Sequence, residues 1–108
     1  MFTLLLSGCE PSITGIRISK YPDSIVYIAG ESTELDLCSG EIEIMRGKKE
    51  ENIVKETMCY YYLHIESDID FNTPGVYEVV IYVNYKNPIN VKFAVQVIDE
   101  DFFENAKP

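Results

Sequence analysis

The chain has 108 residues, of which 46% are hydrophobic, and eighteen acidic against nine basic residues give it a net charge of −9. This length and hydrophobic content suit one domain whose core needs no metal. The acidic excess excludes nucleic acid as a partner, because a phosphate backbone would be repelled. After Leu6 no uncharged stretch approaches the about 18 residues of a membrane-spanning helix, so we expect no second membrane element.

The first element in chain order is an apolar run, Phe2 to Leu6, followed by Ser7-Gly8-Cys9. Leu6-Ser7-Gly8-Cys9 resembles the lipobox of bacterial lipoproteins, and small residues at a cleavage site are typical of a signal peptide. The resemblance implies that residues 1–8 are a residual signal peptide, that Cys9 is lipidated, and that residues 9–12 anchor the protein to the extracytoplasmic face of the cell membrane. A start codon assigned too far downstream would explain why the run is short and lacks a preceding Lys or Arg. The alternative is a short apolar strand with an incidental cysteine.

From Ile13 onward, apolar residues recur at every second position, which predicts half-buried strands. The alternating sets are Ile16 and Ile18; Leu35 and Leu37; Ile42 and Ile44; Tyr61, Leu63 and Ile65; and Val91, Phe93, Val95 and Val97. Val76 to Val83 is almost continuously apolar, as expected of a central strand, whereas Lys48 to Glu51 is predicted to be a solvated loop. Short strands separated by turn residues about every ten positions indicate an antiparallel two-sheet sandwich.

Several segments in order resemble a bacterial immunoglobulin-like domain of the group-3 type. They are Ile16–Lys20, Tyr27, Gly30-Glu31, Leu35-Asp36-Leu37, Ser39-Gly40, Pro74-Gly75-Val76-Tyr77 and Val79. The resemblance implies an all-β fold, an Ig-like antiparallel β-sandwich of about seven strands over residues 13–98. Independently of it, the acidic residues after Ile98 predict an acidic tail at residues 99–108. Independently, Gly75 after Pro74 suits a turn that needs positive φ, and Tyr77 suits a tyrosine corner, with its hydroxyl returned to nearby backbone.

If Cys9 is lipidated, Cys38 and Cys59 remain as a pair that could close a disulfide loop of about 20 residues. Strand alternation places Cys38 on the face of Glu34 and Asp36, but it places Cys59 on the face of the apolar residues that follow it. A bulge near Gly40 would reconcile the two faces. A disulfide and two independent half-buried thiols therefore both stay open.

Candidate catalytic and metal-binding residues are few. His64 is the only histidine and lies on a polar strand face without a glycine elbow, so we expect no catalytic triad and no enzyme activity. Asp68, Asp70 and Asn72 have the alternate spacing of a calcium loop, but its glycine and its terminal glutamate are missing. We therefore expect an ordinary connecting loop there, and no metal or cofactor.

Tyr60, Tyr62, Tyr82 and Tyr85 are the candidates for ligand contact, since aromatic rings suit both sugars and peptides. The alternative is cross-strand aromatic pairing within a sheet. The leading functional hypothesis is a non-enzymatic, lipid-anchored surface module for adhesion, spacing or protein binding. The alternatives are a carbohydrate- or cell-wall-binding module and an accessory peptidase inhibitor. The expected partners are the membrane, through the lipid, and a protein or glycan at the cell surface.

Overall fold

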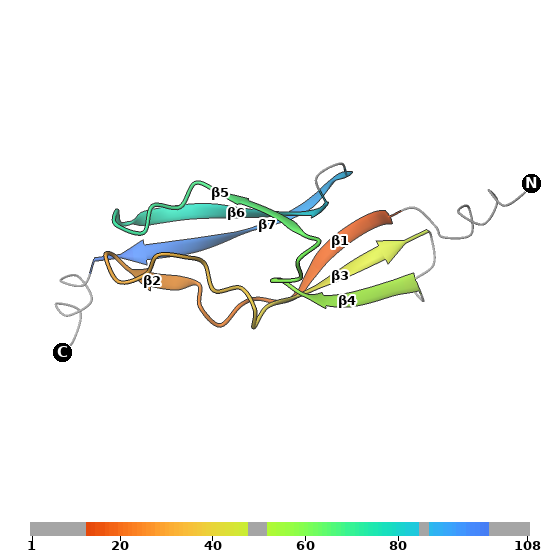
Figure 1. Ribbon diagram of the computed structural model, residues 1–108, viewed down its shortest axis with the longest axis horizontal. Helices are drawn as coiled ribbons and strands as arrows, with labels where there is room; N and C mark the ends of the chain where they lie inside the picture. Colours follow the sequence, from red (N-terminus) through yellow and green to blue (C-terminus); the bar gives the residue numbers. More distant parts are fainter. Residues whose placement is uncertain (1–12, 48–51, 85–86, 100–108) are drawn as a thin grey trace, which may run out of the picture.

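The computed structural model describes residues 13–47, 52–84 and 87–99. These residues form seven strands in two sheets (Figure 1), which confirms the predicted all-β sandwich. The strands are β1 (Ile13–Lys20), β2 (Val26–Ile28), β3 (Glu41–Arg46), β4 (Ile53–Thr57), β5 (His64–Ser67), β6 (Gly75–Asn84) and β7 (Asn87–Ile98). Within the described ranges, no helix is long and apolar enough to cross a membrane.

The larger sheet has the strand order β2-β7-β6-β5, and β6 and β7 form its long antiparallel ladder. Val79, Ile81 and Val83 of β6 are buried, with at most 6% of each residue exposed. In β7 the inward residues Phe93, Val95 and Val97 alternate with exposed neighbours, as the period of two predicts. Because β6 has a partner on both sides, its almost continuous apolar run corresponds to a central strand.

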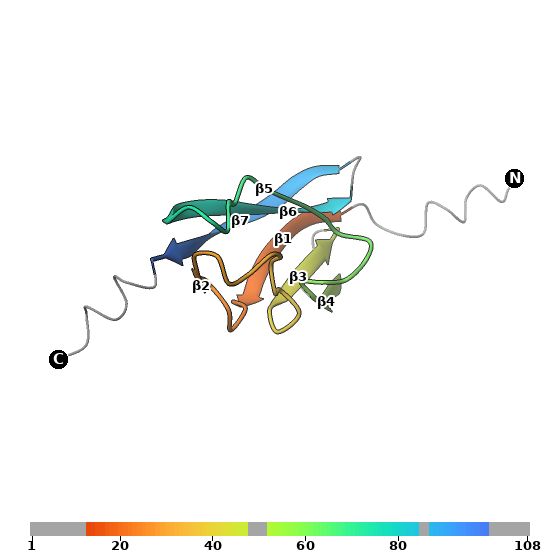
Figure 2. The same ribbon diagram turned by 60° about the vertical axis from the view of Figure 1, so that its left-hand side comes forward.

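The smaller sheet has the order β1-β3-β4, and it is antiparallel throughout. Ile16 of β1 lies opposite Ile44 of β3, and both are buried. On the outer face Arg17 forms an ion pair with Glu43. The two sheets form separate layers, with β1 packed next to β7 (Figure 2).

The connections within this sandwich differ from those of an antibody domain, in which the third and fourth strands belong to different sheets. Here β4 stays beside β3 as a hairpin, and β5, β6 and β7 follow each other as neighbours in the other sheet. The short strand β2 pairs in parallel with β7, so the fold is not entirely antiparallel. In this pair Val26 of β2 lies opposite Gln96 of β7. The chain thus changes sheets between β1 and β2, and again after each of β2 and β4.

Two segments predicted to be strands are irregular instead. Leu35 to Leu37 lies outside every strand, because the Asp36 N–H donates to the Tyr27 hydroxyl at 3.0 Å and the Leu37 carbonyl accepts from Gly40 at 2.9 Å. The predicted strand around Tyr61 begins only at His64. These hydrogen bonds replace a sheet ladder, so alternation of apolar residues no longer dictates the structure there.

The turn before β6 corrects one prediction and supports another. The described glycines with positive φ are Gly30, at 85°, and Gly47, at 66°, so the prediction of positive φ at Gly75 is wrong. Gly75 is instead the first residue of β6, opposite Val97 of β7. The Tyr77 hydroxyl donates to the Thr73 carbonyl at 2.7 Å, which is the backbone contact predicted for it.

Candidate functional site

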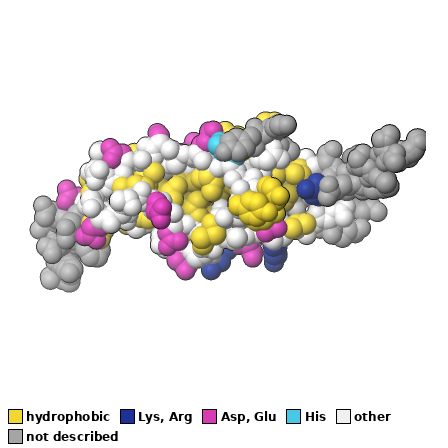
Figure 3. Space-filling view, viewed as in Figure 1, with side chains coloured by type: hydrophobic (Ala, Val, Ile, Leu, Met, Phe, Trp, Pro, Cys, Tyr) yellow, Lys and Arg dark blue, Asp and Glu magenta, His cyan; other side chains and the backbone are white. Residues whose placement is uncertain are grey.

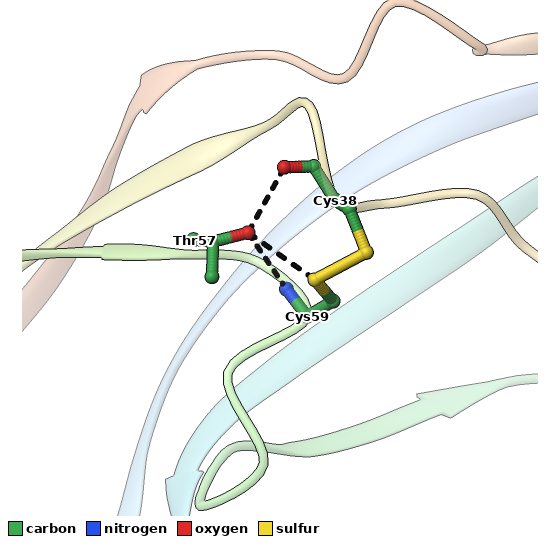
Figure 4. Close-up of a disulfide and its surroundings, with 3 residues drawn as sticks. All are labelled: Cys38, Thr57 and Cys59. Atoms are coloured by element: carbon green, nitrogen blue, oxygen red, sulfur yellow. Dashed lines mark hydrogen bonds between the residues drawn. A yellow bond between two sulfur atoms is a disulfide. The ribbon is translucent and has the colours of Figure 1, made fainter.

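Cys38 and Cys59 are joined by a disulfide with their Cα atoms 4.9 Å apart (Figure 4). Both residues are exposed, and each lies in a turn rather than in a strand. The Met58 N–H donates to the Gly40 carbonyl at 3.0 Å, which brings the two turns together. Strand alternation was therefore the wrong guide to whether the two thiols could meet.

Thr57 links both sides of this disulfide (Figure 4). Its hydroxyl donates to the Cys38 carbonyl at 3.0 Å and accepts from the Cys59 N–H at 3.3 Å. The same oxygen lies 3.3 Å from the Cys59 Sγ. One side chain at the end of β4 thus fixes the backbone on both sides of the disulfide.

A groove of about 610 Å³ opens beside the disulfide. One wall is the segment 34–38, and the other contains Cys59, Tyr60, Tyr61, Leu63 and Ile65. Leu37 and Leu63 are buried at its base, whereas Glu34 and Asp36 are exposed at its rim. Figure 3 shows hydrophobic side chains gathered across the middle of this face of the molecule.

The wall formed by residues 34–38 is held by hydrogen bonds from the core side. Tyr27, which is 6% exposed and packs edge-on against Phe71, accepts the Asp36 N–H. Further along, the Ser39 hydroxyl accepts the Asp23 N–H at 2.8 Å. Although this wall has no regular secondary structure, hydrogen bonds hold its backbone at Asp36, Leu37 and Cys38.

Three consecutive tyrosines are called here the tyrosine cluster: Tyr60 and Tyr61, which line the groove, and Tyr62, whose ring packs against both of theirs. The rings of Tyr61 and Tyr62 are 4.2 Å apart between centroids, and Tyr60 lies 5.3 Å from Tyr61. Tyr60 packs against the core, whereas Tyr61 is 78% and Tyr62 60% exposed. Adjacent exposed aromatic residues of this kind are characteristic of binding surfaces.

Tyr61 is the member of the cluster that the sequence pattern placed on the apolar strand face. It is exposed because the chain turns at this point, where the Leu63 N–H donates to the Tyr60 carbonyl at 3.0 Å. A hydrogen bond with the side chain of Tyr62 raises the pKa of Tyr61, and desolvation and the charge of Tyr60 add to that shift. The run of three aromatic residues was visible in the sequence, but its turn was not.

The other two candidate tyrosines are not part of this cluster. Tyr82 lies in β6 opposite His64 of β5, with 5.8 Å between the ring centroids. The His64 Nε2 lies 2.9 Å from a Glu66 carboxylate oxygen. Tyr82 is thus involved in cross-strand pairing, the alternative considered for these residues, while Tyr85 lies outside the described residues.

The aspartate-containing loop before β6 is organised by internal hydrogen bonds. The Asp70 carboxylate accepts the Asn72 N–H and the Thr73 hydroxyl, each at 2.9 Å. These two bonds lower the pKa of Asp70. Its carboxylate thus has a local structural role. Among the described residues, no group of three or more His, Cys, Asp or Glu side chains could hold a metal ion.

Cys9, the proposed tether and most of the acidic tail lie outside the described residues. Comparisons of the chain with protein-family models, with curated proteins and with solved structures found no match. The groove, its disulfide and the tyrosine cluster are therefore the features on which a function can be argued.

Proposed function

We propose that this protein is a non-enzymatic, lipid-anchored module on the extracytoplasmic face of a bacterial membrane, and that it binds a protein partner through the groove beside the Cys38–Cys59 disulfide. The observation that carries the proposal is the exposure of Tyr61 and Tyr62, at 78% and 60%, next to an apolar groove. Tyrosine combines a large apolar ring with a polar tip and loses little conformational entropy on binding. A spacer domain has no need of such a surface.

The position of the groove suits a protein anchored at its N-terminus. Three residues separate Cys9 from the first residue of β1, Ile13, and they reach about 10 Å when fully extended. Lys20, at the other end of β1, pairs with Glu41, the residue just after the turn that contains Cys38. The groove therefore lies toward the end of the smaller sheet that is remote from the tether, and a lipid at Cys9 would leave it accessible.

A carbohydrate-binding module is the second candidate, because the exposed rings of Tyr61 and Tyr62 could stack on sugar rings. An inhibitor of peptidases would need a projecting segment that enters an active site. The site described above is concave, which favours receiving a segment of the partner over inserting one. The carbohydrate alternative keeps the tyrosine cluster as the contact surface, so a probe in this cluster tests it together with the proposed function.

The proposal can be tested in bacterial cells that express the full chain with a photo-cross-linking amino acid at position 61, which lines the groove and is 78% exposed. We expect the protein in the membrane fraction, with lipid on Cys9 by mass spectrometry and with covalent adducts to a surface protein. The same probe at position 76 is the matched control, because Val76 is 70% exposed but lies on β6 and does not line the groove.

Cys9→Ser should release the protein from the membrane. An unmodified Cys9 in a host that processes lipoproteins would contradict the proposed lipid anchor. Equal amounts of adduct from positions 61 and 76 would contradict binding through the groove.

A further inference from the structure

We propose that the groove binds an extended peptide segment that presents a Lys or, preferably, an Arg side chain between apolar residues. This inference rests on the proposed function and specifies its partner. It starts from the rim, where the exposed carboxylates of Glu34 and Asp36 belong to one wall and the Tyr61 ring belongs to the other.

Glu34 and Asp36 belong to the same wall, and both line the groove. Both residues are exposed, while Leu37 is 5% exposed and packs into the core. Within the described residues neither carboxylate has an ion-pair or hydrogen-bond partner, so both can accept a donor from a ligand.

Charge complementarity identifies the ligand group. The groove lining includes two carboxylates and no Lys, Arg or His, in a chain whose net charge is −9. A cation is attracted both by carboxylates and by the face of a tyrosine ring, whereas an acidic group would be repelled. Arginine suits both contacts best, because its planar guanidinium can pair with a carboxylate and stack on an aromatic ring.

The base of the groove accounts for the apolar neighbours of that cation. Leu37, Leu63 and Ile65 form an aliphatic surface next to the disulfide. Its volume of about 610 Å³ lies within the range of roughly 300–1,000 Å³ typical of ligand sites, so a few side chains can enter. A peptide offers alkyl side chains to this base and a cation to the rim. A neutral sugar offers neither.

The experiment uses the full chain with Cys9→Ser, which removes the proposed lipid, and fluorescent eight-residue peptides. The peptides carry valine and leucine around a central Arg, Lys, Gln or Glu. We expect the Arg and Lys peptides to bind at least tenfold more tightly than the Gln and Glu peptides by fluorescence anisotropy. The difference should shrink as salt rises, since exposed charges are screened.

Two groove variants locate the interaction. The double variant Glu34→Gln with Asp36→Asn should no longer prefer the Arg peptide over the Gln peptide. Tyr61→Ala should weaken binding of the Arg peptide about tenfold. The matched control is Asp68→Asn with Glu78→Gln, which changes the net charge equally at two exposed carboxylates that do not line the groove. Thermal unfolding of each variant shows whether a loss of binding is a loss of fold.

An equal loss of binding in the control would overturn the inference, because the attraction would then come from overall charge. Preference for a peptidoglycan-derived oligosaccharide over every peptide would also overturn it, in favour of a glycan. If no peptide binds but position 61 still cross-links a surface protein, the inference fails while the proposed function stands. If neither is seen, both fail.

Discussion

The ladder of β6 and β7 and the irregular pair of segments at residues 34–40 and 58–63 use apolar residues in opposite ways. In the ladder, alternate side chains such as Val79 and Val95 are buried at 0% and 1% exposure, and the strand pairing fixes every one of them. In the irregular pair, two exposed tyrosines and an exposed disulfide surround a groove. The ladder provides stability, and the surface suited to recognition lies where the chain leaves it.

The largest expected effect is in the ladder. Ile81→Ala should lower the free energy of unfolding by about 2–5 kcal/mol, because Ile81 is fully buried in the central strand and truncation leaves a cavity. Val76→Ala in the same strand is the control, since Val76 is 70% exposed and surface changes cost about 0.5 kcal/mol or less. Chemical denaturation measures both. Similar losses would mean that the assigned inward face of β6 is wrong.

The same contrast explains what could be predicted from the sequence. In β7 and the β1–β3 pair, the ladder imposes a period of two, so alternation alone identified the buried residues. In β6 the almost continuous apolar run did not show which face is buried, and Val76 is 70% exposed. Leu35-Asp36-Leu37 shows the same alternation, but its backbone bonds to the Tyr27 hydroxyl and to a turn. Such contacts join residues distant in sequence or depend on turn geometry, and alternation does not encode them. Tyr61 was assigned to the wrong face for this reason.

The disulfide should have the next largest effect. Replacing Cys38 and Cys59 together by serine should lower the free energy of unfolding by about 3 kcal/mol, because it restores the entropy of a loop of about 20 residues in the unfolded chain. The measurement is denaturation on a Cys9→Ser background with and without reductant. Reductant should destabilise the protein that retains both cysteines and leave the double variant unchanged. A protein with free thiols under oxidising conditions would contradict the assignment.

Gly40 tests how closely the two irregular segments must approach. A Cβ on Gly40 would overlap the buried Met58 thioether and lie 3.1 Å from the Pro22 Cδ, so Gly40→Ala should cost about 1–3 kcal/mol. Gly75→Ala is the matched control, because its Cβ would lie 3.5 Å from the Tyr77 ring, an ordinary contact. Thermal unfolding compares the two variants. Equal costs would show that the approach at Gly40 is not close.

The smallest expected effect is a pH dependence in the loop before β6. The hydrogen bonds from Asn72 and Thr73 lower the pKa of Asp70 below its ordinary value of 3.8. A carboxylate whose pKa is lower in the folded state stabilises the fold above the unfolded pKa, and this contribution is lost as the pH falls through the folded pKa. The stability advantage of the unmodified protein over Asp70→Asn should therefore be constant near neutral pH and shrink below about pH 4.

Denaturation at a series of pH values measures this difference, with Asp68→Asn as the control for loss of one negative charge. A constant advantage down to pH 2 would mean that the Asp70 carboxylate does not hold the loop through its charge.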